Sequence, residues 1–374
     1  MLIDIVAGAR PNFMKIAPIL EAIGVAQQEG IPLEYRLIHT GQHYDPNMSA
    51  AFFEQLGIAA PHVNLQVGSG TQAAQAAAIM VGYEKVLFRH RPHLLLVVGD
   101  VTSTMACAIT AKKMGSILVA HVEAGMRSGD LSMPEEINRL VTDALTDFFF
   151  TTTRTATANL RSNGVPEEHI FFVGNTMIDT LLQNKHRFEA PPVWKQLGLQ
   201  AEGYFVLTLH RSGNVDDPRK LQNLLQTVVD ASRGLPILFP VHPRTARMLS
   251  QIHLQAPHLH LLEPLGYLQF NYLVQHAKAV ITDSGGVAEE TTVLHVPCLT
   301  LRANTERPET CTIGTNQVVG TSPEAIEEAF EKLFTEGWVK GDIPEKWDGK
   351  AAKRIVECLV HIFEARLKPT PACV

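Results

Sequence analysis

Short runs of consecutive apolar residues recur along the whole chain, and the stretches between them carry apolar residues at helical spacing. The runs predicted as strands are Leu2–Ala7, Tyr35–His39, Leu94–Val98, Ile117–His121, Phe148–Thr151, Ile170–Val173, Tyr204–Leu209, Ile237–Val241, Leu259–Leu262, Ala279–Thr282 and Cys298–Leu301. A strand without a polar face is buried on both sides, which is typical of a parallel sheet covered by helices. The alternation of strand and helix therefore predicts an α/β fold with doubly wound, Rossmann-like sheets.

The alternation pauses in a polar, proline-containing stretch around residues 178–202. A junction between domains is expected in such a stretch, because few contacts cross it. A chain of 374 residues, 45% of them apolar, is also too long for one ordinary domain. We therefore predict two domains, at residues 1–175 and 176–350, followed by an amphipathic helix over Ala351–Arg366.

The charged residues are interspersed, and 32 Lys and Arg against 38 Asp and Glu give a net charge of −6. Neither a basic face for nucleic acid nor a polybasic membrane patch is expected. The five cysteines show no CxxC or metal-ligand spacing, which is typical of reduced residues in the cytoplasm. No signal peptide precedes Leu2–Ala7, and apolar runs such as Leu94–Val98 are too short to span a membrane. We expect a cytoplasmic protein without nucleic-acid or membrane partners.

The first predicted strand runs into a glycine turn at Gly8 and then a helix whose first turns carry Arg10 and Lys15. Free amides at a helix start, together with two cations, suit a diphosphate. The alternative is a turn with two solvated surface cations. The segment is not a GxGxxG fingerprint, so no NAD is expected.

The second strand ends in the polar loop 39–45. This loop contains two histidines, but no third ligand stands at a spacing suited to a metal. We expect the loop to contact a ligand or another domain.

Three carboxylates stand where predicted strands end or the next helix begins. Asp100 follows the third strand, Glu123 follows the fourth, and Glu135 opens the next helix. Because the carboxyl ends of parallel strands meet at one edge, these acids are expected to converge. Each also has a simpler interpretation: Asp100 as a helix cap, Glu123 as a partner for Arg127, and Glu135 as a complement to the helix dipole.

In the second half, a histidine and an arginine follow each of the first two strands. The first pair is His210-Arg211, and the second is in the run His242-Pro243-Arg244. As isolated residues they are more often structural polar groups than catalysts. Their repetition at two strand ends favours a site.

A strand also ends at Ser284-Gly285-Gly286, a turn whose amides can approach a phosphate at the start of the following helix. Glu290, further along that helix, is placed to reach a ribose diol, although a plain capped helix would carry the same acids. Arg307 offers a planar fork for a phosphate or for a nearby acid.

These motifs resemble, in order, those of the non-hydrolysing UDP-N-acetylglucosamine 2-epimerase family, and the resemblance covers roughly residues 8–320. The matching segments are Gly8-Ala9-Arg10-Pro11, His39-Thr40-Gly41-Gln42-His43, Gly99-Asp100, His121-Val122-Glu123-Ala124-Gly125, Pro134-Glu135-Glu136-Ile137-Asn138-Arg139, His210-Arg211, Asp283-Ser284-Gly285-Gly286, Glu289-Glu290 and Thr305-Glu306-Arg307-Pro308-Glu309. Gly213 and Ala288 depart from the pattern, which often has an acid and a glutamine there.

The resemblance implies two domains of the GT-B type facing across a cleft, with a C-terminal helix at 351–368 that rejoins the first domain. It also implies a homodimer, no cofactor, no metal, and a UDP-N-acetylhexosamine as substrate, with a role in cell-surface polysaccharide synthesis. The residues that match the family's active site are Arg10, Lys15, Asp100, Glu123, Glu135 and His210, and those that match its UDP site are Phe270, Ser284, Gly285, Glu290 and Arg307.

The expected reaction interconverts UDP-GlcNAc and UDP-ManNAc. The C2 hydrogen has no adjacent carbonyl, so cleavage of the anomeric C–O bond must accompany its removal, giving UDP and a 2-acetamidoglucal that are then recombined. Such chemistry needs cations and amides for the diphosphate and carboxylates for proton transfer, with Asp100, Glu123, Glu135 and His210 as candidates. The alternatives are a hydrolysing epimerase that releases ManNAc, a glycosyltransferase, and a non-catalytic UDP-sugar-binding protein.

Overall fold

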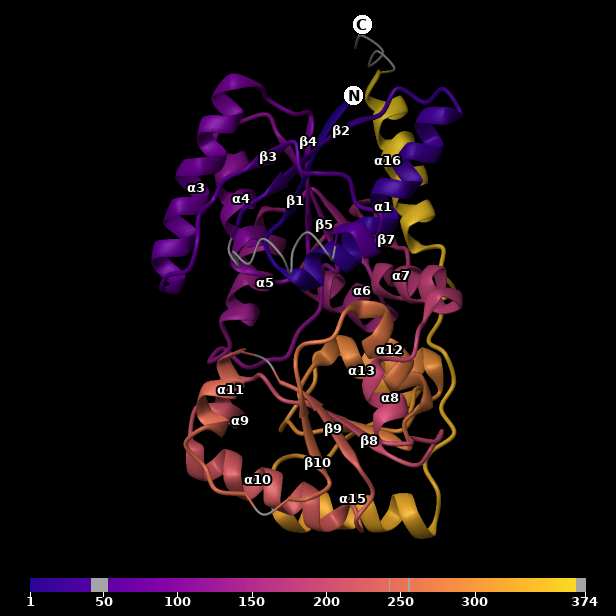
Figure 1. Ribbon diagram of the computed structural model, residues 1–374. Coiled ribbons are helices and arrows are strands. Elements are labelled where there is room, and N and C mark those ends of the chain that lie inside the picture. The colour runs from indigo at the N-terminus through magenta and orange to yellow at the C-terminus, as the bar shows by residue number, and fades with distance from the viewer. Residues whose placement is uncertain (42–52, 242, 255, 368–374) are drawn as a thin grey trace, which may run out of the picture. The chain divides into compact units, whose positions relative to one another are not determined.

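The structure is a computed structural model that describes residues 1–41, 53–241, 243–254 and 256–367 (Figure 1). It divides the chain into two compact units. Unit 1 comprises Met1–Gln183 and Glu345–Val374, and unit 2 comprises Asn184–Pro344. Each unit holds one all-parallel sheet with helices on both faces, so the predicted fold class of two doubly wound, Rossmann-like domains is confirmed.

The sheet of unit 1 has the strand order β3-β2-β1-β4-β5-β6-β7. Its strands are β1 (Leu2–Ala7), β2 (Glu34–His39), β3 (Val63–Asn64), β4 (Leu94–Val98), β5 (Leu118–Val122), β6 (Phe148–Thr151) and β7 (Ile170–Phe172). The helices of unit 1 are α1 (Arg10–Gln28), α3 (Gln72–Arg89), α4 (Thr102–Lys113), α5 (Pro134–Leu145), α6 (Arg154–Ser162), α7 (Thr176–Asn184) and α16 (Ala351–Leu367), with a 3₁₀ turn at Glu167–His169.

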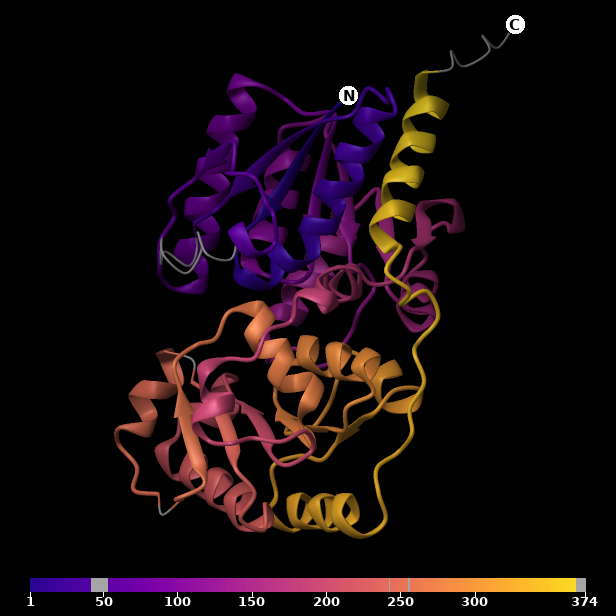
Figure 2. The same cartoon turned by 45° about the vertical axis from the view of Figure 1, so that its right-hand side comes forward.

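Helices α3 and α4 pack on one face of this sheet, where Tyr83 and Ala108 join Val6, Leu95 and Val97 in a buried cluster. Helices α1 and α16 pack against each other, and they lie side by side in both views (Figures 1 and 2). Every residue of β4 is buried, as expected for a central strand covered on both faces.

The sheet of unit 2 has the order β10-β9-β8-β11-β12-β13. Its strands are β8 (Phe205–Thr208), β9 (Ile237–Pro240), β10 (Leu259–Leu262), β11 (Ala279–Thr282), β12 (Cys298–Thr300) and β13 (Asn316–Val318). The helices of unit 2 are α8 (Pro192–Gln196), α9 (Ser212–Val215), α10 (Pro218–Ala231), α11 (Pro243–Leu249), α12 (Tyr267–His276), α13 (Gly285–Leu294), α14 (Glu309–Thr312) and α15 (Pro323–Thr335), with a 3₁₀ turn at Lys185–Arg187.

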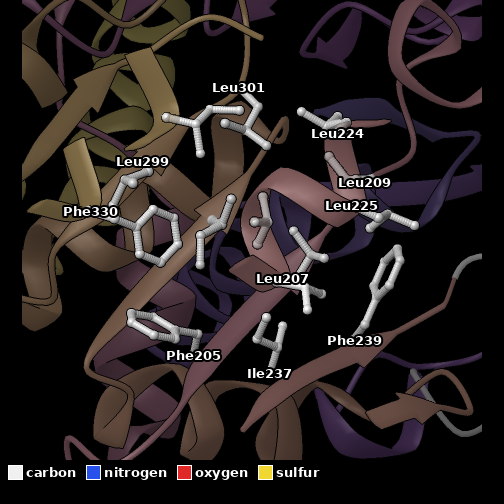
Figure 3. Close-up of a cluster of buried hydrophobic side chains, with 14 of the residues drawn as sticks. Phe205, Leu207, Leu209, Leu224, Leu225, Ile237, Phe239, Leu299, Leu301 and Phe330 are labelled. Atoms are coloured by element: carbon white, nitrogen blue, oxygen red, sulfur yellow. The ribbon is translucent and has the colours of Figure 1, made fainter. Parts of the chain in front are cut away.

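Alternate residues of the unit 2 strands face two separate hydrophobic clusters. Phe205 and Leu207 of β8 pack with Phe330 of α15 and with leucines of α10 (Figure 3), whereas Val206 faces the opposite cluster with Leu273 of α12. Because successive side chains of a strand point to opposite faces, a strand buried on both sides reads as a continuous apolar run. This arrangement explains the unbroken runs in the sequence.

Two short strands were missed by the sequence analysis: β3, which has two residues, and β13, which begins with the polar Asn316. The Asn316 side chain accepts a hydrogen bond from Thr300 Oγ1 (2.7 Å), so its polarity is satisfied inside the unit. Several predicted strand ends are also wrong by one residue. Both ends differ at β8, where the predicted run Tyr204–Leu209 exceeds the strand, and at β5, where the predicted run Ile117–His121 lies one residue too early.

The chain returns to unit 1 through a segment that is fixed to it before α16 begins. Trp347 is buried, and its Nε1 donates to the Thr152 carbonyl (3.1 Å). The carboxylate of Asp179 on α7 accepts the backbone N–H groups of Ala351 (3.1 Å) and Ala352 (2.7 Å). Asp179 therefore caps the first turn of α16 from another helix.

Among the described helices, none has the length and apolar character needed to cross a bilayer.

Candidate active site

Each sheet has one point at which the strand order reverses, and ligands of doubly wound sheets bind beyond the strand ends at such points. In unit 1 the order reverses between β1 and β4, and in unit 2 between β8 and β11. The loops after these four strands hold Gly8–Arg10, Gly99–Asp100, His210–Arg211 and Asp283–Gly285. Four of the motifs singled out in the sequence therefore directly follow the strands at the two switch points.

In unit 1, Asn12 joins the loops after β1 and β4. Its Oδ1 accepts the N–H groups of Gly8 and Ala9 (both 3.1 Å), and its Nδ2 donates to the Val98 carbonyl (2.9 Å). Asn12 is 1% exposed. The sequence analysis gave it no role, although an asparagine in the first turn of a helix after a glycine is a signal for such a contact. The predicted Arg10 begins α1 beside it.

Lys15 and Glu123 form a buried ion pair, with Nζ 2.6 Å from Oε2 and side chains only 6% and 2% exposed. The alternative interpretations, a solvated Lys15 and a Glu123–Arg127 pair, are both wrong: Arg127 pairs with Asp143 instead (2.7 Å). Glu123 has φ +72°, a left-handed conformation that is unusual for a residue with a side chain. Its Oε1 is buried and has no hydrogen-bond partner among the described residues. A strained acid with an unused oxygen is typical of a functional site.

Asp100 is held by α5. Its Oδ2 lies 2.5 Å from Arg139 Nη2, and its carbonyl accepts from Asn138 Nδ2 (2.8 Å). The expectation that Asp100 could cap the next helix is wrong, because the N-cap of α4 is Val101 and makes no side-chain hydrogen bond. The Asp100 side chain is 23% exposed, so it combines a fixed orientation with access to a ligand.

Helix α5 also carries the neighbouring acids Glu135 and Glu136 in its first turn. Glu135 is half-buried, whereas Glu136 is buried and accepts from Ser128 and from Arg139 Nη1 (2.6 Å). Burial would raise the pKa of Glu136, but the hydrogen bonds from Ser128 and Arg139 outweigh it and hold that pKa below its ordinary value. Glu136 thus stays ionised and orients Arg139 toward Asp100.

The Gly99 turn brings two of the predicted acids to one place. A Cβ added to Gly99 would lie 3.1 Å from Lys15 Nζ and 3.5 Å from Glu123 Oε2, and Asp100 is the next residue. Gly99 has φ +69°, which disfavours any residue with a side chain. The close approach of backbone and ion pair therefore depends on glycine.

In unit 2, Asp283 organises the loop after β8. Its carboxylate accepts the backbone N–H groups of His210 and Arg211 (3.1 and 2.9 Å), Asn214 Nδ2 (3.1 Å) and His210 Nδ1 (2.8 Å). Burial would raise the pKa of Asp283, but these contacts outweigh it and hold the pKa below its ordinary value. Because Nδ1 of His210 faces a carboxylate, it donates, which leaves Nε2 for a ligand on a side chain that is 42% exposed.

Arg307 lies against the start of α13. A Cβ on Gly285 would come within 2.3 Å of Arg307 Nη1, so only glycine allows this approach. The guanidinium also pairs with Glu289 (Nε to Oε1, 2.7 Å) and Glu306 (Nη1 to Oε1, 2.5 Å). Ser284 is the N-cap residue of α13, and Gly286 is half-buried in its first turn. The two acids fix the guanidinium at this helix N-terminus, and one of them, Glu306, is also paired with Arg302 (2.8 Å).

Glu290 is buried in unit 2, where its Oε1 accepts from Tyr267 Oη (2.9 Å). Burial raises the pKa of Glu290 to about 7, which the hydrogen bond from Tyr267 only partly offsets. Tyr267 was missed by the sequence analysis, although it lies one helical turn before Phe270 on α12. Phe270 itself is half-buried and packs on the hydrophobic cluster under α12.

Part of the predicted loop 39–45 and His242 lie outside the described residues. Within the part of the chain that is described, no three His, Cys, Asp or Glu side chains gather in a way that could hold a metal ion.

Comparison with known proteins gives a consistent result. A family model described as UDP-N-acetylglucosamine 2-epimerase matches residues 26–360. The chain is 38% identical to the UDP-N-acetylglucosamine 2-epimerase of Methanocaldococcus jannaschii, over 96% of this chain and 99% of the relative. It is 37% identical to the UDP-2,3-diacetamido-2,3-dideoxy-D-glucuronate 2-epimerase of Pseudomonas aeruginosa, over 97% of this chain and all of the relative.

Among solved structures, the chain is similar to the crystal structure of the Methanocaldococcus jannaschii UDP-GlcNAc 2-epimerase in complex with UDP-GlcNAc and UDP. The TM-score is 0.86 at 39% identity, and the match covers 96% of this chain and 100% of the other. This likeness over the whole length confirms the expected GT-B type of fold.

Proposed function

The chain belongs to the UDP-N-acetylglucosamine 2-epimerase family, and from this premise we propose that it interconverts UDP-GlcNAc and UDP-ManNAc without releasing free sugar. In the proposed reaction, the anomeric C–O bond breaks and the C2 proton is lost, giving UDP and a 2-acetamidoglucal. UDP then adds back to C1, and a proton adds to the opposite face of C2. Atoms and charge balance without a redox cofactor.

The observation that carries this proposal is the set of carboxylates at the switch point of unit 1. Asp100 directly follows Gly99, the Glu123 carboxylate lies beside Gly99, and Glu135 opens α5, the helix whose Arg139 holds Asp100. Epimerisation at C2 needs one group to remove a proton from one face and another to return a proton on the opposite face. Glu123, fixed by Lys15, and Asp100, fixed by Arg139, can together with Glu135 supply both groups and stabilise positive charge at C1.

Lys15 has a different proposed role from that of a plain phosphate ligand, because its charge is already paired with Glu123. We propose that it fixes the position of the Glu123 carboxylate through their ion pair and that any contact with the diphosphate is shared with this pair. Arg10, in the first turn of α1, remains the proposed phosphate contact on this side.

Unit 2 is proposed to bind the UDP. Ser284, Gly285 and Gly286 offer amides at the start of α13, and Arg307 is held against the same helix end. Glu290 is proposed to accept the ribose hydroxyls, and Phe270 to contact the uracil. His210, with Nδ1 committed to Asp283, is proposed to donate to the diphosphate through Nε2.

A second candidate substrate is favoured by one specific observation. The relative that acts by its name on UDP-2,3-diacetamido-2,3-dideoxy-D-glucuronate is 37% identical to this chain, almost the same as the 38% of the UDP-GlcNAc enzyme. The same elimination would serve this substrate, because it too carries an acetamido group at C2. We therefore propose UDP-GlcNAc as substrate and the diacetamido uronate as the compound to compare with it.

We also propose that the protein is a cytoplasmic homodimer that supplies cell-surface polysaccharide synthesis. Support for dimerisation comes from apolar side chains exposed on α3 and α5: Val81 (52%), Phe88 (69%), Ile137 (42%) and Leu140 (37%). Both helices flank α4. Sedimentation equilibrium would show a mass of twice 41.1 kDa, and a monomer at micromolar concentration would contradict the proposal.

The proposed reaction is tested by proton NMR of UDP-GlcNAc with the enzyme in deuterated buffer. Epimerisation without hydrolysis should give UDP-ManNAc with deuterium at C2 and no free ManNAc. Accumulation of ManNAc and UDP would instead show hydrolysis. A spectrum that never changes would support a transferase lacking its acceptor or a binding protein, and saturation-transfer signals from UDP would show that the inactive protein still binds the nucleotide. Glu135→Gln serves as the control for contaminating activity.

A further inference from the structure

His121 is a fully buried residue near the end of β5 that has no part in the proposed reaction so far. Both nitrogens of its ring have a partner. Nδ1 lies 2.7 Å from Asp143 Oδ1, and Nε2 lies 2.9 Å from the carbonyl oxygen of Gly99. The ring thus connects α5 to the turn that precedes Asp100.

Both partners of the ring are hydrogen-bond acceptors. A backbone carbonyl cannot donate, and Asp143 is ionised, because His121 and Arg127 hold its pKa below the ordinary value even though burial alone would raise it. Asp143 Oδ2 is occupied by Arg127 (2.7 Å) and by the N–H of Gly125 (3.1 Å). A carbonyl oxygen only accepts, so Nε2 of His121 carries a hydrogen and donates it to Gly99.

Gly99 is held to β5 by both of its backbone polar groups. Its N–H donates to the Val122 carbonyl (2.9 Å), and its carbonyl accepts from His121. These two contacts fix a left-handed residue that supports the Lys15–Glu123 pair from one side and leads directly into Asp100. A rotation of the Gly99 peptide would move both the ion pair and the Asp100 backbone.

We propose that His121 is a positioning residue of the reaction: by donating to the Gly99 carbonyl, its ring fixes the turn that presents Asp100 and supports the Lys15–Glu123 pair. The inference rests on the proposed function, because it concerns the acids assigned there. His121 itself does not touch the substrate. The competing interpretation is that the ring only fills space between β5 and α5.

Two substitutions separate these interpretations. The amide nitrogen of glutamine reaches the position of Nε2, so His121→Gln retains a donor for Gly99 and loses the contact with Asp143. Asparagine reaches only the position of Nδ1, so His121→Asn retains the Asp143 contact and loses the donor for Gly99. The two variants differ in which contact they keep and by one methylene group in size, so the test is the order of their activities: the proposal requires the variant that keeps the donor for Gly99 to be the more active one.

We expect the kcat of His121→Asn to fall at least about tenfold, with KM changed less than about threefold, because the lost contact orders acids that act in the chemical step. The kcat of His121→Gln should exceed that of His121→Asn by at least about fivefold. Thermal unfolding of both variants checks that they are folded to a similar extent. Equal kcat values in two folded variants would overturn the proposal.

A second measurement does not depend on activity or on either variant folding well. In wild-type protein labelled with ¹⁵N-histidine, Nε2 of His121 should carry a hydrogen, and this hydrogen should show the slowest exchange among the ring hydrogens of the 16 histidines. Observation of an unprotonated Nε2 in the buried ring would overturn the proposal. If the protein proved inactive on UDP-GlcNAc, this spectrum would still test the geometry, so the two failures are distinguishable.

Discussion

At the scale of single residues, the site of unit 1 contains a buried ion pair, and burying its two charges costs free energy. Removing Lys15 and Glu123 from water costs several kcal/mol for each ion, and their attraction only roughly repays it. A buried pair is therefore weak evidence for stability. The left-handed backbone of Glu123 and the unpartnered Oε1 are further costs. Costs that gather on one carboxylate are expected where that carboxylate has a chemical task.

The first prediction concerns the three acids of unit 1. Asp100→Asn, Glu123→Gln and Glu135→Gln keep the size of each side chain and remove its ability to exchange a proton. Each should lower kcat by at least about 100-fold if the acid transfers a proton in the reaction. Steady-state rates of UDP-ManNAc formation measure this, with circular dichroism as the check on folding. Near-normal rates in all three variants would contradict the assignment.

The second prediction follows from the pKa of Glu290, which burial raises from 4.5 to about 7. Because the pKa of Glu290 is higher in the folded protein, its carboxyl group contributes stability that is present below the pKa of the unfolded chain, 4.5. This stability is lost as the pH rises through about 7. Ribose hydroxyls that donate to Glu290 would favour its ionised form, so UDP binding near pH 7 should release a proton from it. Calorimetric titration in two buffers of different ionisation enthalpy measures that release.

Glu290→Gln is the control for this experiment, because UDP itself also changes its protonation near neutral pH. The wild-type protein should release more protons than the variant. Equal release by the two proteins would show that Glu290 does not bind the ribose in its ionised form.

At the scale of elements, helix α13 and Arg307 meet at Gly285, where any side chain would collide with the guanidinium. Gly285→Ala should force Arg307 away from Glu289 and the helix start, and weaken UDP binding at least about tenfold. Gly213→Ala, in the helix α9 of the same unit, is the matched control, since nothing lies within 4 Å of its added Cβ. UDP affinity by calorimetry compares the two, and equal affinities would refute the role of Gly285.

Helix α16 depends on a cap whose strength changes with pH. Burial raises the pKa of Asp179 from 3.8 to about 6, although the N–H groups of Ala352 and Ala351 lower it. The stability that Asp179 contributes is therefore present below about pH 4 and lost as pH rises through about 6. Asp179→Asn does not titrate and can accept only one of the two N–H groups with ease.

The melting temperature of the wild-type protein, relative to that of Asp179→Asn, should accordingly fall by about a few degrees between pH 5 and pH 7.5, because Asp179 loses its bound proton in this range. Thermal unfolding at both pH values measures it, with Asp217→Asn as the control, since Asp217 is exposed and caps α10 through the N–H groups of Arg219 and Lys220. A difference that is independent of pH would count against this account of the cap.

The elements that the sequence predicted are those buried on both faces. Leu94–Val98 is wholly apolar, and Ala279–Thr282 is apolar except for a buried threonine at its end. Both strands have the predicted bounds. Strand β13 was missed because Asn316 satisfies its polar side chain through Thr300, a contact that no local pattern reveals. In the same way, glycines and acids after strands indicated the site, but the partner of Asp100 is Arg139, 39 residues further along the chain. Long-range pairing of this kind depends on the fold.

At the scale of the whole molecule, two Rossmann-like units are built from a chain that leaves unit 1 after Gln183 and returns to it at Glu345. Each unit has one switch point, and the residues at the two switch points differ in chemistry. Unit 1 has carboxylates that are each held in an ion pair with a cation, whereas unit 2 has a glycine turn, an arginine and a histidine. The proposed function assigns proton transfer to the first set and UDP binding to the second.

The central claim is that the bond between C1 and the UDP oxygen breaks during epimerisation. It is tested most directly with UDP-GlcNAc that carries ¹⁸O in this bridging position. If UDP leaves and returns, its β-phosphate can rotate in between, and the label in recovered substrate should move to the non-bridging positions while deuterium from the solvent appears at C2. Epimerisation with all of the label still in the bridge would contradict the account.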